Sequence, residues 1–289
     1  HRAYVTDSAM MLEWSDTTDL TYMHADSLWA EEIPFTTYSL IERDSILVDS
    51  VMTAQMPDTI WRDTTYQQLR AFHNVRIFRS DMQAVCDSAR YHGKDSILTL
   101  FGLPICWNED NQLSADQIDV YIKNQEVDYM HGVGNAIAIK REGIEEFNQL
   151  AGKEMFAYVR DRDIYLVDVQ GNAETVFYPQ EDDGTYIGVN RTQSSFVKLY
   201  LKDRKIDYVL FTTATTGVMI PLDQALENER KLSGFFWAEE ERPHSPEDIF
   251  SHPPRTVRPV AGTVSAAAED EEEAEEDEEE NKATRRQNR

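Results

Sequence analysis

The sequence predicts an all-β protein made of stacked antiparallel hairpins, and three observations support this fold class. A thirteen-residue pattern occurs three times, beginning at Ile118, Met155 and Val197. In each copy the apolar residues alternate with a period of two, which is typical of a half-buried β-strand. Each copy then reaches a short turn, after which the alternation resumes. Because a single hairpin is only marginally stable in water, copies that recur about every forty residues are expected to stack and bury one apolar face.

The first strand of each copy is predicted to turn its apolar residues toward the protein interior. These nine residues are Ile118, Val120, Ile122, Met155, Ala157, Val159, Val197, Leu199 and Leu201. The opposite face carries a tyrosine at the same position of every copy, Tyr121, Tyr158 and Tyr200. Side chains opposite one another on neighbouring strands interact, so we expect an aromatic ladder on the outer surface.

The turns are predicted at three dipeptides, in which Asn or Asp can adopt the left-handed backbone of a tight hairpin. These are Asn124-Gln125, Asp161-Arg162 and Asp203-Arg204. None of them contains glycine, which leaves the turn type open. Alternation then resumes at Val127 and Tyr129, at Ile164 and Leu166, and at Ile206 and Tyr208.

The earlier half of the chain carries a looser signal. Residues 6–10, 25–29, 86–90 and 115–119 each place an Asp just before a strand-like run. Such an Asp can bond backbone amides where the chain enters a strand. A metal site is the alternative, and it is less favoured because the Asp residues lie far apart in the sequence.

One β domain is predicted over residues 1–250. Residues 31–67 break the rhythm and are predicted to be an insertion between two repeats, with a weak strand at 45–51. The regular pattern returns at Arg70 and extends to about Leu222.

The end of the chain has a different composition. A helix is predicted at 223–232, and 223–250 is expected to form a strap over one end of the sheet. The segment 269–289 holds 11 acidic and 4 basic residues and offers almost nothing to bury. Residues 251–289 are therefore expected to be a disordered acidic tail.

Charge and composition exclude several classes of protein. The formal net charge is −25, from 53 acidic and 28 basic residues, whereas nucleic-acid binding and adsorption to anionic lipid require a basic surface. No run of 18 apolar residues is present, so no membrane-spanning helix is expected. The sequence has no initiator Met at its start and no signal-peptide core, so we expect a mature or trimmed product that starts inside a repeat. Cys86 and Cys106 pair only if neighbouring strands bring them together.

No motif of an enzyme is present, and no catalytic residue, cofactor or metal site is predicted. The sequence lacks G-x-S-x-G, H-E-x-x-H and C-x-x-C. Gly132 begins "GVGNAI", but a dinucleotide fingerprint needs a third glycine and a following helix. The triplets Gly134-Asn135-Ala136 and Gly171-Asn172-Ala173 recur at one repeat position and are interpreted as repeat punctuation. Acidic pairs such as Asp182-Asp183 are interpreted as solvated turns.

Four features together resemble a known family. They are "AFHNVRIFRSDMQAVCDSARY" from Ala71, "GLPICWNEDNQLSADQI" from Gly102, the repeated "GNA" triplets, and "GFFWAEEERPHSPEDIF" from Gly234. They are similar to the OstA-like proteins of Bacteroidetes-type Gram-negative bacteria, relatives of the periplasmic lipopolysaccharide-transport protein LptA and of the N-terminal domain of the translocon LptD. The resemblance covers about residues 1–250.

The resemblance implies a β-jellyroll, a sheet folded over like a taco, whose apolar groove accepts the acyl chains of lipid A. It implies a non-enzymatic periplasmic protein of outer-membrane biogenesis. Its expected partners are lipopolysaccharide and other β-jellyroll proteins that stack through open edge strands. The candidate groove residues are Ile118, Val120, Ile122, Val127, Met155, Val159, Ile164, Leu166, Val197, Leu199, Leu201 and Ile206.

Two alternatives stay open from the sequence. The same fold can serve as a structural or interaction module with a filled core and no lipid ligand. A β-solenoid enzyme acting on glycans would instead show clustered carboxylates in a cleft. The predicted insertion and the acidic tail depart from the family pattern, and no barrel-forming region follows the domain.

Overall fold

The computed structural model describes residues 2–14, 20–41, 46–48, 51–53, 58–181 and 183–251. All strand pairings in these residues are antiparallel, which confirms the predicted all-β class. The strands are β1 (Arg2–Trp14), β2 (Leu20–Ile41), β3 (Ile46–Val48), β4 (Val51–Thr53), β5 (Asp58–Arg79), β6 (Met82–His92), β7 (Ile97–Phe101), β8 (Ile105–Asn108), β9 (Asn111–Ser114), β10 (Gln117–Lys123), β11 (Glu126–Arg141), β12 (Phe147–Arg160), β13 (Asp163–Phe177), β14 (Gly188–Lys202), β15 (Lys205–Thr212) and β16 (Thr216–Pro221). The short helices are α1 (Glu227–Arg230), η1 (Glu239–Glu241) and η2 (Glu247–Phe250).

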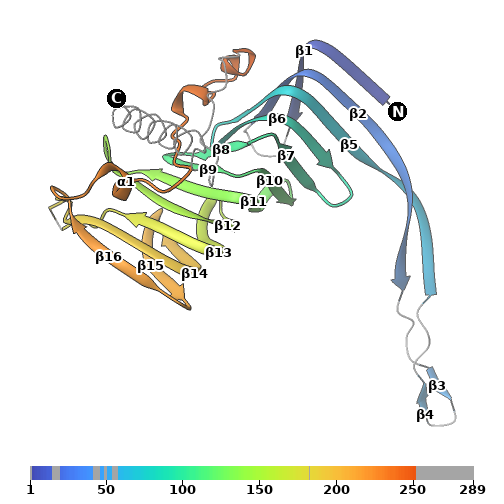
Figure 1. Cartoon of the computed structure of the whole chain (residues 1–289). Coiled ribbons are helices and arrows are strands. Elements are labelled where there is room, and N and C mark those ends of the chain that lie inside the picture. The colour runs from blue at the N-terminus through green and yellow to red at the C-terminus, as the bar shows by residue number, and fades with distance from the viewer. Residues whose placement is uncertain are drawn as a thin grey trace, which may run out of the picture.

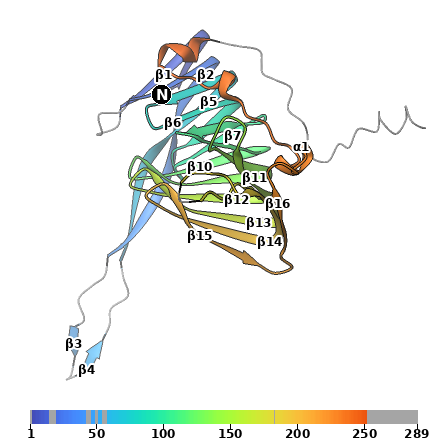
Figure 2. The same ribbon diagram turned by 90° about the vertical axis from the view of Figure 1, so that its left-hand side faces the viewer.

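Fourteen strands form one sheet (Figure 1). Its main path runs β1-β2-β5-β6-β7-β10-β11-β12-β13-β14-β15, and β8, β9 and β16 pair beside this path. Figure 2 shows the later strands of the stack following one another from β10 to β15. The strands β3 and β4 form a separate two-stranded sheet.

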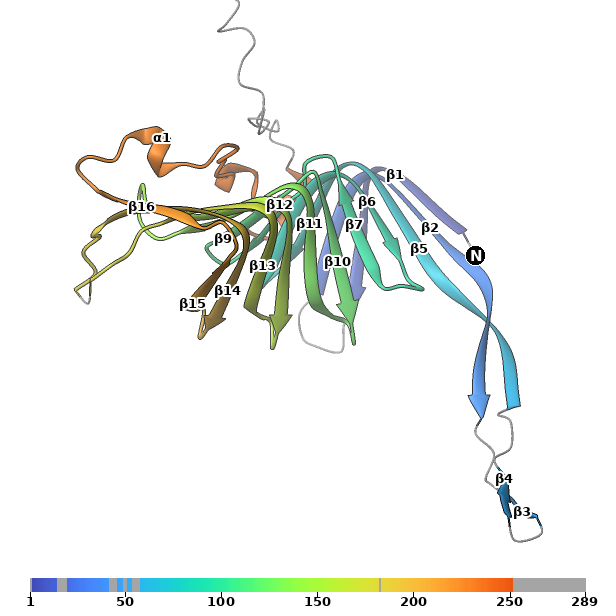
Figure 3. The same cartoon turned by 60° about the horizontal axis from the view of Figure 1, so that its bottom comes forward.

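The sheet folds over along one line, and this bend makes the jellyroll (Figure 3). In β11 the bend lies at Gly134 and Asn135, where φ is +73° and +47° and the register with β12 shifts. In β13 it lies at Gly171 and Asn172, where φ is +79° and +51°. Glycine and asparagine tolerate this left-handed backbone better than other residues do, so the repeated triplets do mark the repeats, as predicted.

The bend divides the sheet into two limbs. The first limb contains β7, β10 and β15 with the strand halves that pair with them, and the second limb contains β8, β9 and β16 with theirs. Between β7 and β8 the bend occurs at Gly102 and Leu103, and between β15 and β16 at Thr213 and Ala214, all with positive φ. The inner face is the face of the sheet enclosed by the two limbs.

The inner face carries the main core, and the predicted direction of the first strand in each repeat is confirmed. Ile118 and Met155 are fully buried in this core. Six more of the nine predicted residues belong to it or pack on it, namely Val120, Ile122, Ala157, Val197, Leu199 and Leu201. Val159 lines a small hollow beside it.

The uninterrupted alternation predicted beyond the turns is wrong, because each hairpin contains one extra residue in its second strand. Val159 pairs with Ile164, but the preceding Tyr158 pairs with Leu166, which leaves Tyr165 as an extra residue. The register shifts in the same way at Asp128 in β11 and at Asp207 in β15. Such a bulge reverses the face of every later residue in the strand.

The bulge moves Leu166 to the outer face, so its assignment to the groove is incorrect. Leu166 pairs with Tyr158 on one side and Tyr200 on the other, within the tyrosine row. Val127, Ile164 and Ile206 precede the extra residue and stay on the inner face. In each turn that precedes the bulge, both central residues have positive φ, as in a type I′ hairpin.

The predicted insertion at 31–67 contains long paired strands. The pairing of β2 with β5 continues from Ser27 opposite Phe72 to Ile41 opposite Asp58. The single weak strand predicted at 45–51 is a hairpin of β3 and β4 in the structure.

The helix predicted at 223–232 is limited to α1. The side chain of Arg191 binds the carbonyl of Asn228 at 2.8 Å, and Gln149 accepts a hydrogen bond from the N–H of Leu232 at 2.7 Å. These two backbone groups are the ones that a longer helix would join, so the sheet stops the helix. No helix in the described residues is long and apolar enough to cross a membrane. The predicted acidic tail lies outside the described residues, apart from Ser251.

Candidate functional site

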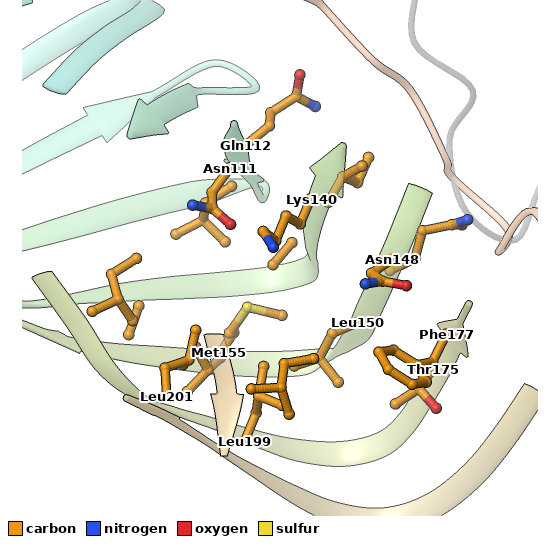
Figure 4. A pocket seen from close by; sticks show the side chains of 18 of the residues that line it. Asn111, Gln112, Lys140, Asn148, Leu150, Met155, Thr175, Phe177, Leu199 and Leu201 are labelled. Carbon is orange, nitrogen blue, oxygen red and sulfur yellow. The ribbon is translucent and has the colours of Figure 1, made fainter. Parts of the chain in front are cut away.

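The first of two large hollows lies on the inner face at the β15 end of the sheet (Figure 4). It encloses about 440 Å³ between the limbs, and we call it hollow A. Strands of the first limb contribute Met155, Val167, Leu199 and Leu201, and the second limb contributes Leu150. Alternation directs these aliphatic side chains inward from several neighbouring strands, so the hollow has an apolar floor.

One end of hollow A is polar. Figure 4 shows Asn111, Lys140 and Asn148 at this end. The ammonium of Lys140 donates to the Glu142 carboxylate at 2.7 Å, and Asn148 donates to the same carboxylate at 2.9 Å. The Glu142 carboxylate therefore fixes the positions of both the Lys140 ammonium and the Asn148 amide.

A second ion-pair cluster lines hollow A. Arg204 bonds both Glu109 and Asp163, with 2.8 Å between its Nε and the Asp163 carboxylate. One guanidinium thus pairs with both carboxylates of this cluster.

The second hollow lies on the inner face toward the β1 end. It encloses about 680 Å³, and we call it hollow B. Its apolar lining comes from strands β2, β5, β7 and β10: Met23, Leu69, Ile77, Leu98, Leu100, Val120 and Ile122. Its charged rim includes Arg2, whose Nε lies 3.2 Å from the Glu31 carboxylate.

Met82 and Cys106 line both hollows. The two hollows therefore meet at these side chains and belong to one feature, which we call the inner groove. A third hollow of about 20 Å³ touches it beside Val127, Val159 and Ile164. The groove thus extends along the interior of the folded sheet.

The two cysteines do not form a disulfide, and both are buried. Burial raises the pKa of the Cys106 thiol to about 12. The Cys86 thiol donates to the Ser88 carbonyl at 3.3 Å. Neither has the exposed, electropositive setting of a reactive thiol.

Most of the predicted groove residues lie at the groove. Hollow A is lined by Met155, Ile164, Val197, Leu199, Leu201 and Ile206, and hollow B by Val120, Ile122 and Val127. Val159 lines the third hollow, Ile118 lies in the packed core, and Leu166 lies on the outer face.

Sequence reasoning missed the contribution of the earlier strands. Leu69, Ile77, Leu98 and Leu100 line hollow B, and Met82 joins the hollows. The apolar residues Leu98 and Leu100, two positions apart, indicated an inward-facing strand, but this strand lies outside the three copies of the repeat.

Three Asp residues of the looser repeat signal, Asp26, Asp87 and Asp116, bind side chains of neighbouring strands at the bend. Asn74 donates to Asp26 at 2.9 Å, and Asn135 donates to Asp116 at 3.0 Å. A Cβ at Gly134 would lie 2.4 Å from the Asp116 carboxylate, so the glycine makes room for this contact. In the described residues no group of His, Cys, Asp and Glu could hold a metal ion.

The outer face of the first limb carries the predicted aromatic ladder. The rings of Tyr121 and Tyr129 stack at 4.1 Å between centroids, and those of Tyr200 and Tyr208 at 4.3 Å. Burial, followed by the neighbouring Tyr121, raises the pKa of Tyr129 to about 12. Each stacked pair joins two neighbouring strands through ring contacts, so the ladder stabilises the sheet.

The segment 223–250 packs on the outer face of the second limb. Gln112 and Gln149 are both buried there, and each binds its backbone through both amide atoms. Gln112 donates to the Phe236 carbonyl at 2.6 Å and accepts from the Ala238 N–H at 2.9 Å. The segment leaves the groove uncovered by lying on the other side of the sheet.

Comparisons with known proteins give one structural likeness to report. No family model matches the sequence, and no curated protein matches it either. Among solved structures, the chain is similar to LptH of Pseudomonas aeruginosa, described as the LptA-homologous periplasmic component of the lipopolysaccharide transport device. The TM-score is 0.39 and the identity 13%, over 49% of this chain and 99% of that chain.

Proposed function

We propose that this protein is a non-enzymatic lipid carrier that holds acyl chains in the inner groove. One observation carries the proposal: two hollows of about 440 and 680 Å³, joined at Met82 and Cys106, are lined mainly by aliphatic side chains. Both volumes fall in the range of roughly 300–1,000 Å³ found for small-molecule sites. A filled-core module would have packed this space.

Lipopolysaccharide is the proposed lipid, and the periplasm is the proposed location, in outer-membrane biogenesis. This part of the proposal rests on the sequence resemblance to the OstA-like proteins. Each methylene buried from water contributes about 0.8 kcal/mol, so several acyl chains suffice for tight binding without any charge contact.

The ion pairs of the groove favour a headgroup that stays outside. Lys140 is paired with Glu142, and Arg204 with Glu109 and Asp163. A phosphate that approached either cation would also meet a carboxylate. We therefore expect the acyl chains, and not the phosphates, to provide the binding energy.

The two open edges of the sheet are the proposed docking surfaces for other β-jellyroll proteins. At one edge β1 exposes Tyr4, Val5 and Met10, and at the other β15 exposes Tyr208 and Leu210. Unpaired edge strands accept a further strand through their free backbone groups.

Site-specific photo-crosslinking to lipopolysaccharide tests the carrier function. A photoreactive residue at Leu199 points into hollow A, whereas one at the adjacent Tyr200 points outward and serves as the matched control. We expect lipid crosslinks at Leu199 and at Ile122, and none at Tyr200. Circular dichroism confirms that each variant is folded. Crosslinks from Tyr200 alone, or from none of the three, would favour the interaction module without a ligand.

A further inference from the structure

An ion pair joins the two limbs of the sheet at their free ends. The turn between β14 and β15 ends the first limb and carries Arg204, and the turn between β8 and β9 ends the second limb and carries Glu109. The Arg204 guanidinium bonds the Glu109 carboxylate, 95 positions away in the chain. Both side chains line hollow A, and they are 60% and 47% exposed, so the pair lies where the hollow meets solvent. We call this ion pair the clasp.

Each partner of the clasp is also held by its own limb. On the first limb, Nε of Arg204 donates to the Asp163 carboxylate at 2.8 Å, at the start of β13. On the second limb, the Glu109 carbonyl accepts a 2.7 Å hydrogen bond from Arg242 of the segment 223–250. Arg242 in turn binds the Gln83 amide oxygen of β6 at 2.9 Å. The clasp therefore joins two supported turns, and breaking it leaves the contacts within each limb in place.

The free ends of the limbs also approach each other beside the clasp, along a line that we call the seam. The third hollow, of about 20 Å³, lies there between the limbs. Its polar lining comes from Asp81 and Asn108 of the second limb and from Glu126 and Arg162 of the first. Water can replace the contacts of such polar groups when the limbs separate, and an exposed ion pair is weak and screened by salt. The seam thus opens at a smaller cost than an apolar contact would.

We propose that the clasp closes a lateral entrance to hollow A, and that acyl chains enter the inner groove when the limbs part between Arg204 and Glu109. This inference rests on the proposed carrier function. Leu199 and Leu201, which precede Arg204 on β14, line the hollow behind the clasp (Figure 4). An acyl chain that enters sideways leaves its headgroup in water throughout. Arg204 stays paired with Asp163 when the clasp opens, so no unpaired cation of the clasp holds back a phosphate.

Stopped-flow fluorescence with a pyrene-labelled fatty alcohol tests the entrance. The probe is uncharged, so salt acts on the protein alone. Glu109→Gln removes the link between the limbs and leaves Arg204 bonded to Asp163. We expect the probe to enter and leave this variant about two- to fivefold faster, with little change in Kd. The rates of the unmodified chain should rise with ionic strength, and those of Glu109→Gln should rise less.

Lys198→Gln is the matched control. It breaks the 3.2 Å ion pair between Lys198 and Asp168, which are directly opposite each other on two strands of the first limb. This pair does not link the limbs, so the probe should enter and leave the control at the rates of the unmodified chain.

The Cys106 thiol reports the opening of the seam without any lipid. Cys106 is buried and lines hollow A, on the strand that leads to Glu109. Labelling by a thiol reagent, assigned to each cysteine by mass spectrometry, should be about two- to fivefold faster at Cys106 in Glu109→Gln than in the control. Cys86 is buried in the core at the other side of the bend from the seam and should be labelled at an unchanged rate.

The outcomes separate the clasp from the carrier function. If no variant binds the probe but Cys106 is labelled faster in Glu109→Gln, the seam opens at the clasp and the carrier function is wrong. If the probe binds and both variants match the unmodified chain in probe rates and Cys106 labelling, the clasp proposal is wrong and acyl chains enter at the β15 edge. Equal acceleration at Cys86 and Cys106 would also overturn it, because the substitution would then act by unfolding the domain.

Discussion

The N–H of Leu232 donates a 2.7 Å hydrogen bond to Oε1 of Gln149, eighty-three residues earlier in the chain. The Nε2 of the same Gln149 donates to the Arg230 carbonyl at 2.7 Å. One buried side chain thus satisfies a donor and an acceptor of the C-terminal segment, as a neighbouring strand would. This segment is consequently part of the fold.

Replacing this glutamine should destabilise the domain. Gln149→Ala leaves the N–H of Leu232 without its partner and leaves the Arg230 carbonyl with only the 3.4 Å bond from the Tyr178 hydroxyl. The expected loss is about 2–4 kcal/mol in the free energy of unfolding. Urea denaturation measures the loss, and Gln193→Ala, at an exposed position of β14, is the control. An equal, small effect of both substitutions would show that the C-terminal segment contributes little to stability.

Because of the bulge in β13, a charge at Val169 should destabilise the protein more than a charge at Leu166. Val169 is fully buried on the inner face, so Val169→Asp should cost about 3 kcal/mol or more. Leu166→Asp lies on the outer face and should cost roughly 1 kcal/mol. Thermal unfolding of both variants checks the register. If Leu166→Asp were the more destabilising variant, β13 would alternate without a bulge.

The cysteines should be unreactive in the native protein. With a pKa of about 12, only about one Cys106 thiol in ten thousand is ionised at pH 8. A thiol reagent should detect no fast-reacting group in the native chain and two in denaturant. Rapid labelling of the native protein would show that the groove opens to water at Met82 and Cys106.

Alkaline pH should weaken the fold through the tyrosine ladder. The pKa of Tyr129 is about 12 in the folded protein, against 10 for an ordinary tyrosine. Between these values the unfolded chain loses a proton that the folded chain keeps, so stability is present below pH 10 and falls as the pH rises toward 12.

Tyr129→Phe should remove this part of the pH dependence. Urea denaturation at pH 8 and at pH 11 measures it, and Tyr38→Phe, at an exposed position of β2, is the control. Equal losses of stability in both variants between the two pH values would assign the alkaline effect to other groups.

The sequence predicted features that depend on neighbouring residues along the chain. Alternation in a single strand placed Val120 and Leu199 correctly, because successive side chains always take opposite faces. Leu166 was misplaced, because a bulge depends on the register with the partner strand. The matched turns Asp161-Arg162 and Asp203-Arg204 were predicted correctly, because Asp accepts the left-handed backbone that both turns adopt.

Long-range features could not be predicted in this way. Nothing near Gln112 or Gln149 indicates that each binds a backbone segment more than eighty residues away. The junction of the two hollows is a similar case, because Met82 and Cys106 meet only when β6 and β8 pair. The all-β class therefore followed from local patterns, whereas the shape of the groove depends on distant pairings.

The identical bulges give the repeats a further property. Each hairpin has the same one-residue shift, so its two strands direct their side chains as those of every other copy do. A copy could therefore be added or removed without inverting the faces of the neighbouring strands. Adjacent strands lie about 4.8 Å apart, and each added hairpin would lengthen the array by roughly 10 Å. The number of hairpins thus sets the length of the inner groove, and duplication of one repeat would lengthen the groove by one whole hairpin.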